Sequence, residues 1–521
     1  MTGTMVKRTP HKGKDFIILI LFLGTAITAG CVTEQSLSQD LQNRRAQAYN
    51  TWKQARENEE EARARLKGKL SLEDGLKFAL SNNKSLQAAA QEREISRGVV
   101  LESYGNVLPK ITGTADYIRL DETASFNVGG QSVSLGAVHN YSAGLQVTQP
   151  LFRGGAIPAA LRSAKWVSLL ANEQVRGAVH GVIYDVASAY YNTLLAQHLY
   201  EVNRDAVTSA KAHLKDVQVK RDQGLASDFD VLRAQVDVSL FEAQMIQQKN
   251  RINLSKTRLL RAMGVSQDSA VVLSDSLSYA PIKPVFDEAV RIAYDERADL
   301  YQVELTVKLQ QEALQVARSK YWPKLDAFFR QEWAKPDPHS STKNDWGDAW
   351  SAGLSATWPL FDGLQREGRI RQERERLKQK EITLIDTQEQ ALLEVRQAIL
   401  SLRDAEEFVE SQRLNLARAR EALRLAEVEY REGVAEAVAT TEARSALTRA
   451  QGLYYEAVYN HTMARLALQK SMGILGPGFG EQEAEKKSPI RPGVIGPFES
   501  KNSGNVGAAG LRGETNKGGR Q

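Results

Sequence analysis

The sequence contains a single cysteine, Cys31, and few aromatic side chains, with Phe, Trp and Tyr together making up 7% of its 521 residues. A lone cysteine excludes a disulfide within one chain and leaves no pair of thiols for a zinc or redox site. The seven histidines are scattered, and the sequence has no Walker A loop, no dinucleotide-binding glycine motif and no HExxH motif. These absences argue against an enzyme, a resident metal ion and a bound cofactor.

The body of the chain lacks net positive charge, although the whole sequence carries a formal charge of +5. Residues 1–30 hold four basic residues against one aspartate, and residues 476–521 hold seven basic residues against five glutamates. These two ends account for the whole excess, so residues 31–475 are neutral overall. A neutral body offers no basic surface for phosphates, and nucleic acid is therefore not an expected partner.

Long apolar runs are also missing, since the longest candidate is the fourteen mostly apolar residues from Phe16 to Ala29. This run is too short to cross about 30 Å of hydrocarbon as a helix, and basic residues precede it, as in an export signal. Small residues then lead to Cys31, an order that resembles a bacterial lipobox, although Thr28 stands where an aliphatic residue is usual. The resemblance implies a signal peptide over 1–30 and an acylated Cys31 that anchors the chain in lipid. An ordinary signal peptide followed by a free cysteine is the alternative.

The chain is internally duplicated. Residues 72–109 align without a gap to residues 286–323, and residues 143–264 align without a gap to residues 352–473. The two alignments differ by five residues, and this insertion falls in the loop of the first predicted hairpin, where insertions are tolerated. Matching segments include Pro150-Leu151-Phe152 with Pro359-Leu360-Phe361, and Met263-Gly264 with Met472-Gly473. Agreement over such a length indicates two copies of one structural unit.

Each copy predicts the same order of elements: a helix, two strands joined by a loop, a very long helix, a tight turn and a last helix. The expected organisation is an N-terminal segment over 31–71, a first repeat over 72–280, a second repeat over 281–475 and a disordered tail over 476–521. The predicted helices are 72–105, 156–221, 229–262, 286–320, 364–431 and 437–471. The predicted strands are 110–119, 141–149, 324–333 and 350–358.

Two of the predicted strands alternate between apolar and small polar side chains. The alternation runs from Tyr141 to Thr148 and from Trp350 to Trp358. Each run has about the length that a tilted membrane strand needs, and the two tryptophans lie at opposite ends of one apolar face, as in an aromatic girdle. A half-buried hairpin in a soluble domain would show the same alternation. In lipid, however, strands must form a closed sheet, and four strands from one chain cannot enclose a channel, so several copies are expected to combine.

The long predicted helices carry heptad repeats typical of coiled coils. The helix over 364–431 would be about 100 Å long at 1.5 Å per residue. One of its apolar rows recurs at every seventh residue through Val395, Leu402, Val409, Leu416, Leu423 and Tyr430. The first repeat carries a matching row, so both copies are expected to pack long helices side by side. A soluble coiled-coil scaffold would explain these rows but not the paired hairpins or the export signal.

The duplication, the hairpins and the turns between paired helices resemble the TolC family of outer-membrane factors over about residues 72–475. The resemblance implies a mainly α fold with a small transmembrane β part, in which long coiled-coil helices and two β-hairpins per protomer build a trimeric α/β barrel. It also implies an outer-membrane channel with a long periplasmic portion, a periplasmic adaptor and an inner-membrane pump as partners, and passive conduction of drugs or other small molecules. Heavy-metal efflux and type I secretion are alternatives, and a non-pore periplasmic scaffold lipoprotein is an alternative of another class.

Two helix turns are the adaptor contacts that the resemblance implies. The residues at the tips are Gly224, Leu225 and Ala226 in the first repeat and Gly433, Val434 and Ala435 in the second. Glycine also ends helices sharply as a C-cap, and this structural role is compatible with contact to a partner.

The family closes its periplasmic end with Tyr, Arg and Asp near the second turn, and this chain keeps only part of that pattern. Tyr430 matches the tyrosine, whereas Ala435 and Ala439 stand where the family has Arg and Asp. Asp230 in the first repeat and Glu442 in the second are acidic residues that could form rings at the periplasmic aperture and favour cations. Solvated helix acids are the alternative, and the bonding at the aperture stays open.

Overall fold

The computed structural model of the protein describes residues 34–57, 68–128, 131–340 and 343–476. The predicted signal peptide, Cys31 and the tail from residue 477 lie outside these described residues. The first repeat contains α4 (Leu72–Asn82), α5 (Lys84–Gly105), β2 (Lys110–Arg119), β5 (His139–Arg153), α6 (Ala156–Asp222) and α7 (Asp228–Met263). The second contains α8 (Phe286–Glu296), α9 (Ala298–Arg318), β7 (Lys324–Lys335), β8 (Gly347–Thr357), α10 (Gln365–Arg431) and α11 (Ala437–Ser471).

The predictions of single helices over 72–105 and 286–320 were wrong, because each segment breaks after its first 11 residues. Asn83 has an extended backbone, and its side chain accepts hydrogen bonds from the first amides of α5, which caps that helix. Arg297 is extended at the equivalent position between α8 and α9 but forms no side-chain cap. The remaining long helices begin and end within about two residues of their predicted limits, the usual uncertainty of a helix end.

Several elements were not predicted. These are α2 (Glu34–Glu57), the parallel pair β1 (Gly68–Leu70) and β6 (Val271–Leu273), the antiparallel pair β3 (Ala124–Val128) and β4 (Gln131–Leu135), and one turn of 3-10 helix, Ser319–Tyr321. The pair β3 and β4 lies within the long loop of the first hairpin, the segment that holds the insertion.

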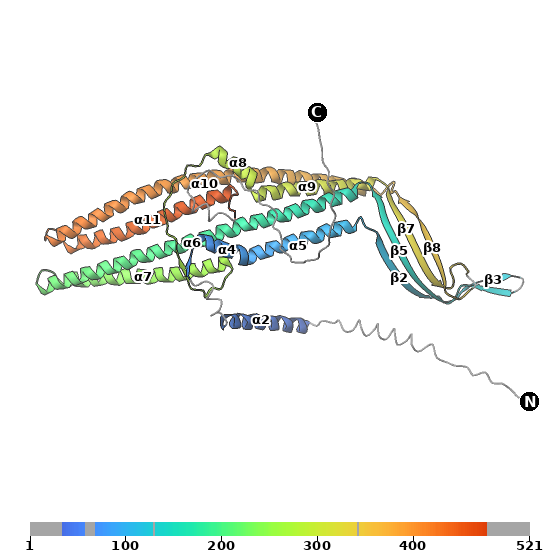
Figure 1. Cartoon of the computed structure of the whole chain (residues 1–521), viewed down its shortest axis with the longest axis horizontal. Coiled ribbons are helices and arrows are strands. Elements are labelled where there is room, and N and C mark those ends of the chain that lie inside the picture. Colours follow the sequence, from blue (N-terminus) through green and yellow to red (C-terminus); the bar gives the residue numbers. More distant parts are fainter. Residues whose placement is uncertain (1–33, 58–67, 129–130, 341–342, 477–521) are drawn as a thin grey trace, which may run out of the picture. The chain divides into compact units, whose positions relative to one another are not determined.

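The main sheet has four antiparallel strands in the order β2-β5-β7-β8 (Figure 1). Strand β5 is longer than predicted because it continues past Pro150 and Phe152, where a bulge shifts its register against β7. Each hairpin of the sheet comes from one repeat, and the central pair β5 and β7 joins the repeats.

The long helices pack in antiparallel pairs, α6 with α7 and α10 with α11. The turns that join each pair lie at the end away from the sheet (Figure 1). Helix α6 also contacts α9 and α11, so it connects the two repeats. Helices α5, α6, α9 and α10 continue from these pairs toward the strands. Among the helices of the described residues, none is both long enough and apolar enough to cross a membrane.

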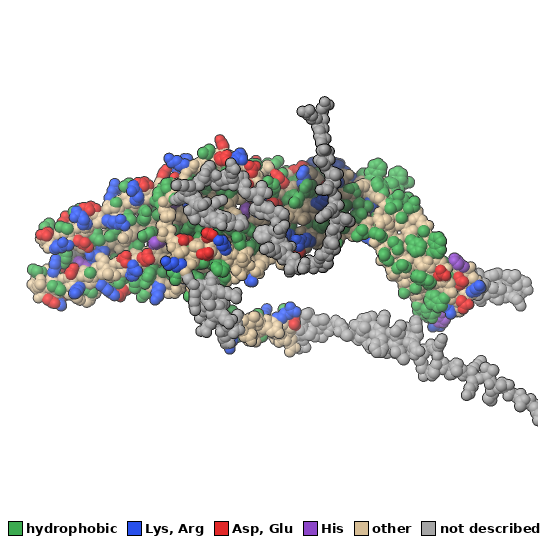
Figure 2. Space-filling model, in the orientation of Figure 1, with side chains coloured by type: hydrophobic (Ala, Val, Ile, Leu, Met, Phe, Trp, Pro, Cys, Tyr) green, Lys and Arg blue, Asp and Glu red, His purple; other side chains and the backbone are tan. Residues whose placement is uncertain are grey.

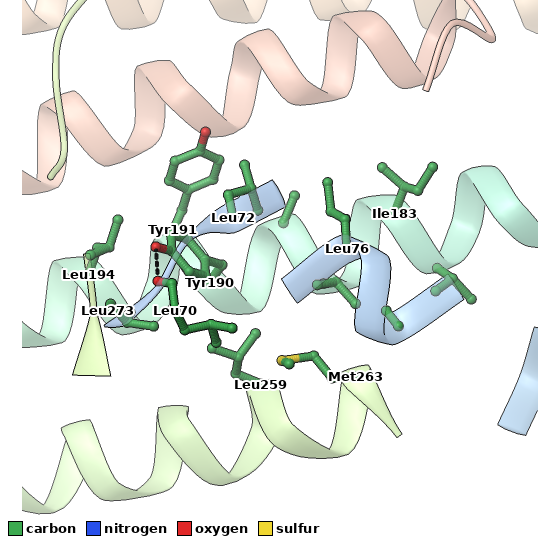
Figure 3. Close-up of a cluster of buried hydrophobic side chains, with 14 of the residues drawn as sticks. Leu70, Leu72, Leu76, Ile183, Tyr190, Tyr191, Leu194, Leu259, Met263 and Leu273 are labelled. Carbon is green, nitrogen blue, oxygen red and sulfur yellow. Dashed lines mark hydrogen bonds between the residues drawn. The ribbon is translucent and has the colours of Figure 1, made fainter. Parts of the chain in front are cut away.

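The largest hydrophobic core lies where β1, β6 and α4 pack on α6 and α7 (Figure 3). Tyr190 is fully buried there, and its hydroxyl donates to the carbonyl oxygen of Leu70 at 2.9 Å and to a carboxylate oxygen of Asp275 at 2.8 Å. Burial, followed by the hydrogen bond to Asp275, raises the pKa of Tyr190. This core fixes the segments that enter and leave the first repeat onto the middle of α6.

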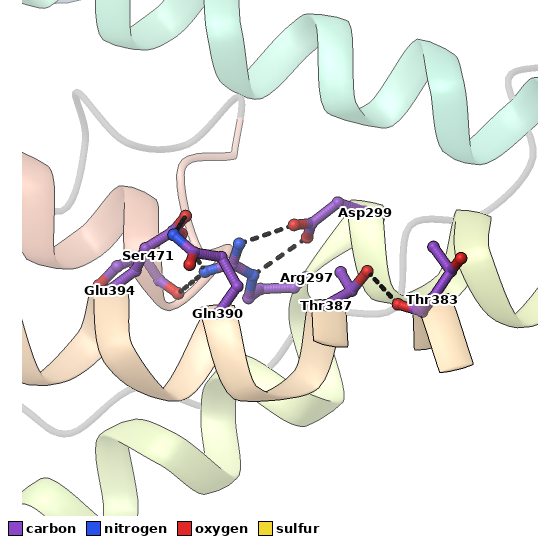
Figure 4. Close-up of polar contacts among 7 residues, drawn as sticks. All are labelled: Arg297, Asp299, Thr383, Thr387, Gln390, Glu394 and Ser471. Atoms are coloured by element: carbon purple, nitrogen blue, oxygen red, sulfur yellow. Dashed lines mark hydrogen bonds and ion pairs between the residues drawn. The ribbon is translucent and has the colours of Figure 1, made fainter. Parts of the chain in front are cut away.

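The same junction is built twice with different chemistry. In the first repeat, Asn83 donates from its side-chain amide to the carbonyl oxygen of Ala262 at 2.7 Å. In the second, Arg297 donates to the carbonyl oxygen of Ser471 at 3.1 Å and also pairs with Asp299 and Glu394 (Figure 4). Both junctions end on a glycine of positive φ, so the duplicated backbone is retained although the side chains have diverged.

Candidate functional site: the sheet and the paired helix turns

One face of the four-stranded sheet is mostly apolar, although Gln331, Lys335 and Asp348 also lie on it. The register brings alternate residues of neighbouring strands to the same side. They include Ile111, Ala115, Tyr117, Tyr141, Ala143, Leu145, Val147, Ala327, Phe329, Trp333, Trp350, Ala352, Leu354 and Ala356. In the single chain Trp350 is 69% exposed and Leu354 is 68% exposed, and hydrophobic side chains gather over the strands in Figure 2. A surface of this kind requires lipid or another protein surface to cover it.

The opposite face of the sheet is mostly polar, although Ile118 and Phe328 lie on it. Arg153 forms a two-bond pair with Asp326 across β5 and β7, and Arg330 donates to the side-chain oxygen of Gln146 at 3.0 Å. Small hydroxyl side chains fill much of the remaining face, among them Thr112, Thr114, Ser142, Thr148, Ser351 and Ser355. A sheet that is apolar on one side and hydrated on the other has the two surfaces of a membrane channel wall.

Both edges of this sheet lack a partner within the described residues. Strand β2 pairs only with β5, and strand β8 pairs only with β7. The side chains of β2 are exposed along its whole length. Unpaired backbone groups on such long edges are costly in lipid, so these edges need strands from elsewhere.

The first helix turn reverses the chain between α6 and α7. Gly224 adopts a left-handed φ of 73°, and the Leu225 amide donates back to the carbonyl oxygen of Lys220 at 2.8 Å. This is the Schellman arrangement. Leu225 is 73% exposed, and Ala226 is half-buried.

The second turn repeats this geometry between α10 and α11. Gly433 has a φ of 77°, and the amide of Val434 donates to the carbonyl oxygen of Glu429 at 2.9 Å. Val434 is 81% exposed, and Ala435 is half-buried. The predicted contact residues of both turns therefore occupy equivalent places, with one large apolar side chain exposed in each.

The helices that follow the two turns start differently. Ser227 caps α7, and the carboxylate of Asp230 accepts hydrogen bonds from the Ser227 amide at 2.9 Å and from its hydroxyl at 2.7 Å. These hydrogen bonds lower the pKa of Asp230. Glu436 occupies the equivalent cap of α11 but makes no side-chain cap bond. Asp230 thus has a structural role at the start of α7, and its role at the aperture stays a prediction.

Tyr430 lies between the two helix pairs. The Lys220 ammonium from α6 sits 3.6 Å from the centre of its ring and donates to the Tyr430 carbonyl oxygen at 3.3 Å. Burial, followed by the negative charges of Asp230 and Asp216, raises the pKa of Tyr430. The structure therefore brings Tyr430 and Asp230 into one electrostatic neighbourhood, whereas Glu442 is exposed on α11 and forms no ion pair with the described residues.

Three residues in this region were not singled out from the sequence. Besides Lys220, they are Arg444 on α11 and His213 on α6, which are only 8% and 7% exposed. Arg444 shares its heptad row on α11 with Gln451, Val458 and Arg465, so the row is not apolar and gives no sequence signal for the burial of Arg444. No cluster of three or more His, Cys, Asp or Glu side chains suited to a metal ion occurs in the part of the chain that the structure describes.

Comparison with known proteins places these features in a wider group. The family model for outer membrane efflux proteins matches residues 76–265 and 289–474. The pyoverdine export outer membrane protein OpmQ of Pseudomonas aeruginosa is 23% identical over 417 residues, which are 78% of this chain and 85% of OpmQ. The outer membrane efflux protein BepC of Brucella suis is 28% identical over 160 residues, only 31% of this chain and 34% of BepC. The crystal structure of the outer membrane protein VceC of Vibrio cholerae shares the fold, with a TM-score of 0.67 at 17% identity over 77% of this chain and 96% of VceC.

Proposed function

The chain belongs to the outer membrane efflux protein family, and we propose that it is the outer-membrane channel of a tripartite export system that conducts drugs or other small organic molecules. The observation that carries this proposal is the sheet with one apolar face, one polar face and two unpaired edges, joined to long helices. A small organic cargo is proposed because OpmQ, which aligns with most of the chain, is named for pyoverdine export. The chain is assigned no catalytic step, and a partner pump supplies the energy.

The proposed assembly is a homotrimer whose sheets join edge to edge. The strands of each sheet alternate in direction, so β8 of one copy and β2 of the next meet as antiparallel neighbours. Two copies would give a barrel of eight strands, and its side chains would fill the interior. Three copies would give twelve strands and leave an open lumen. Trimerisation also removes every free edge from the lipid.

The outer helices of each chain offer a second surface for the same assembly. An exposed apolar stripe runs along α7 on the side away from α6, through Phe229, Leu232, Val236 and Leu240. Another runs along α10 at heptad spacing, through Leu393, Leu400, Leu414 and Val428, on the side away from α11. A neighbouring copy on each side would bury both stripes.

Charge complements this packing. Helix α7 from Lys249 to Arg261 carries five basic residues and no acidic one. Helix α10 from Glu394 to Glu410 carries five acidic residues and two basic ones. Arg261, the last residue of the first segment, and Glu394, the first residue of the second, lie next to the equivalent junctions of the two repeats, so α7 of one copy would face the acidic part of α10 in the next. Opposite charges on two such edges favour this register of copies.

Three finer roles are part of the proposal. Cys31 carries the lipid anchor, and the exposed Leu225 and Val434 contact a periplasmic adaptor. Asp230, Tyr430 and Glu442 lie at the periplasmic aperture, where acidic rings would favour cations.

The test of function is conduction by the purified protein. Detergent-extracted protein should run as a trimer and open ion-conducting pores in planar bilayers, and protein dissociated to monomers before reconstitution should open none. Leu400→Asp and Leu400→Met form a matched pair of variants. Only the aspartate places a charge in the α10 stripe, so only Leu400→Asp should prevent trimer formation when both variants are expressed equally. A monomer that is soluble without detergent and conducts nothing would favour a periplasmic scaffold instead.

A further inference from the structure

Close to the turns, only a few polar side chains join the two helix pairs of one chain. Lys220 reaches from α6 to the ring and the carbonyl oxygen of Tyr430 on α10. Arg444 reaches from α11 to the carbonyl oxygen of Ser209 on α6 at 3.2 Å and to the carboxylate of Glu427 on α10 at 3.1 Å. We name these five residues the tip clasp. The bonds from Lys220 to Tyr430 and from Arg444 to Ser209 each join one residue from each repeat, whereas the bond from Arg444 to Glu427 lies within the second repeat.

Arg444 is the member of the tip clasp that bonds to both α6 and α10. Its side chain is buried, and its Nε has no hydrogen-bond partner among the described residues. A buried guanidinium keeps its charge, so its stability depends on Glu427 and on the Ser209 carbonyl. Separating α6 from α10 and α11 would break the bond to the Ser209 carbonyl and leave the guanidinium with Glu427 alone, so the clasp favours the closed arrangement of the two pairs.

His213 lies inside this arrangement. Its ring is buried on α6, and its centre is 5.8 Å from the ring centre of Tyr430. The charged groups that face it are Asp216 from its own helix, Asp237 from α7, Glu427 from α10 and Arg444 from α11. Burial, followed by the positive charge of Arg444, lowers the pKa of His213, although the three carboxylates oppose this shift.

We infer that Lys220 and Arg444 hold the two helix pairs together beside their turns, and that protonation of His213 weakens this hold in acid. The inference rests on the proposed function in that the turns lie at the periplasmic mouth of the channel. The inference assigns the closing contacts to Lys220 and Arg444, which act as positioning residues. The positions at which the family resemblance places closing residues hold Ala435 and Ala439 in this chain.

The direction of the pH effect follows from the lowered pKa. The clasped state prefers the neutral ring of His213, and a proton binds more tightly once the ring is in water. The clasp is therefore at full strength above the ordinary histidine pKa of about 6.5, and it weakens as the pH falls through that value. The added positive charge also lies beside Arg444, so it acts directly on the contact that holds α11.

The first experiment measures the separation of the two turns without requiring conduction. Spin labels are attached through Gln223→Cys and Glu432→Cys in a Cys31→Ala chain, and each trimer contains mostly unlabelled copies. The distance within one chain should lengthen from about pH 7.5 to about pH 5.5, which spans the histidine range. His213→Gln should abolish this pH response. A distance that ignores pH, or a response that survives in His213→Gln, would overturn the inference.

The second experiment measures the open fraction of reconstituted channels. Lys220→Gln and Arg444→Gln should each raise it roughly fivefold at neutral pH, the equilibrium factor of one hydrogen bond. The exposed Lys215→Gln and Arg431→Gln are matched controls that should leave it unchanged. Trimer retention on size exclusion shows that each variant folds. Unchanged open fractions in both clasp variants would contradict the positioning role. A parent protein that does not conduct at all would contradict the proposed function, and the distance measurement alone would then test the tip clasp.

Discussion

Substituting the exposed apolar residues of the two turns should separate adaptor binding from channel assembly. We consider Leu225→Asp and Val434→Asp, which replace the most outward side chain of each turn. Both residues follow a glycine whose backbone bonds close the turn, and those bonds do not involve the side chains. The turn geometry is therefore expected to survive the change, and the trimer should form normally.

The size of the effect follows from the area that a partner would cover. Leu225 is 73% exposed and Val434 is 81% exposed, so nearly the whole apolar side chain is available for contact. Covering such a side chain is worth about 1.5 kcal/mol, and losing it weakens binding about tenfold. A buried aspartate adds the cost of removing its charge from water, which makes tenfold a lower limit. Three copies in one trimer would multiply the loss through avidity.

The assay is binding of the purified adaptor to reconstituted channels, together with drug resistance of cells at matched expression. Gln223→Glu is the charge control, because it places a carboxylate on the first turn without removing an apolar side chain. Leu225→Met is the conservative control, because it keeps the apolar contact. Adaptor affinity that stays within twofold of the parent in both aspartate variants, with intact trimers, would refute the assignment of these contacts.

Three further predictions concern the scaffold and the anchor. Tyr190→Phe removes the hydroxyl that Asp275 and Leu70 accept from, so the free energy of unfolding should fall by about 1 to 2 kcal/mol, measured by denaturant titration. Arg297→Met leaves the partly exposed Glu394 without its ion-pair partner. The free energy of unfolding should fall by about 2 kcal/mol, less than for a fully buried pair, and the thermal midpoint should fall with it. An unchanged midpoint would show that the ion pair contributes nothing net. Cys31→Ser should abolish incorporation of labelled palmitate, and incorporation that persists would place the acyl chains elsewhere.

The parts of the fold that repeat along the sequence were predictable, and the parts that depend on distant partners were not. The heptad rows located α10 closely because each helical turn supplies its own evidence. Gly224 and Gly433 located both turns because a positive φ favours glycine strongly. The break at Asn83 escaped detection because its side chain bonds Ala262, which is far away in sequence.

The same limit applies to the candidate site. Leu225 and Val434 could be named because the glycines locate the turns in the sequence and the family resemblance assigns the turns to adaptor contact; the structure shows both side chains exposed. Lys220 and Arg444 could not, because a surface lysine at a helix end and an arginine in a charged helix have ordinary local roles. Their bonds to the opposite repeat exist only after α6, α10 and α11 have packed.

Comparison of the two turns indicates which helix pair is the less firmly fixed. Ser227 and Asp230 satisfy each other's backbone groups at the start of α7, and this capping box stabilises the first turn by about 1 kcal/mol or more. Glu436 and Ala439 stand at the equivalent positions and supply no such bonds to α11. The backbone geometry is nevertheless the same, so the second turn depends more heavily on contacts from outside its own helices. Those contacts are Lys220 on Tyr430 and the bonds of Arg444. The two hairpins therefore share one backbone geometry, while the second is held in part by contacts with Lys220 and Ser209 of the first pair.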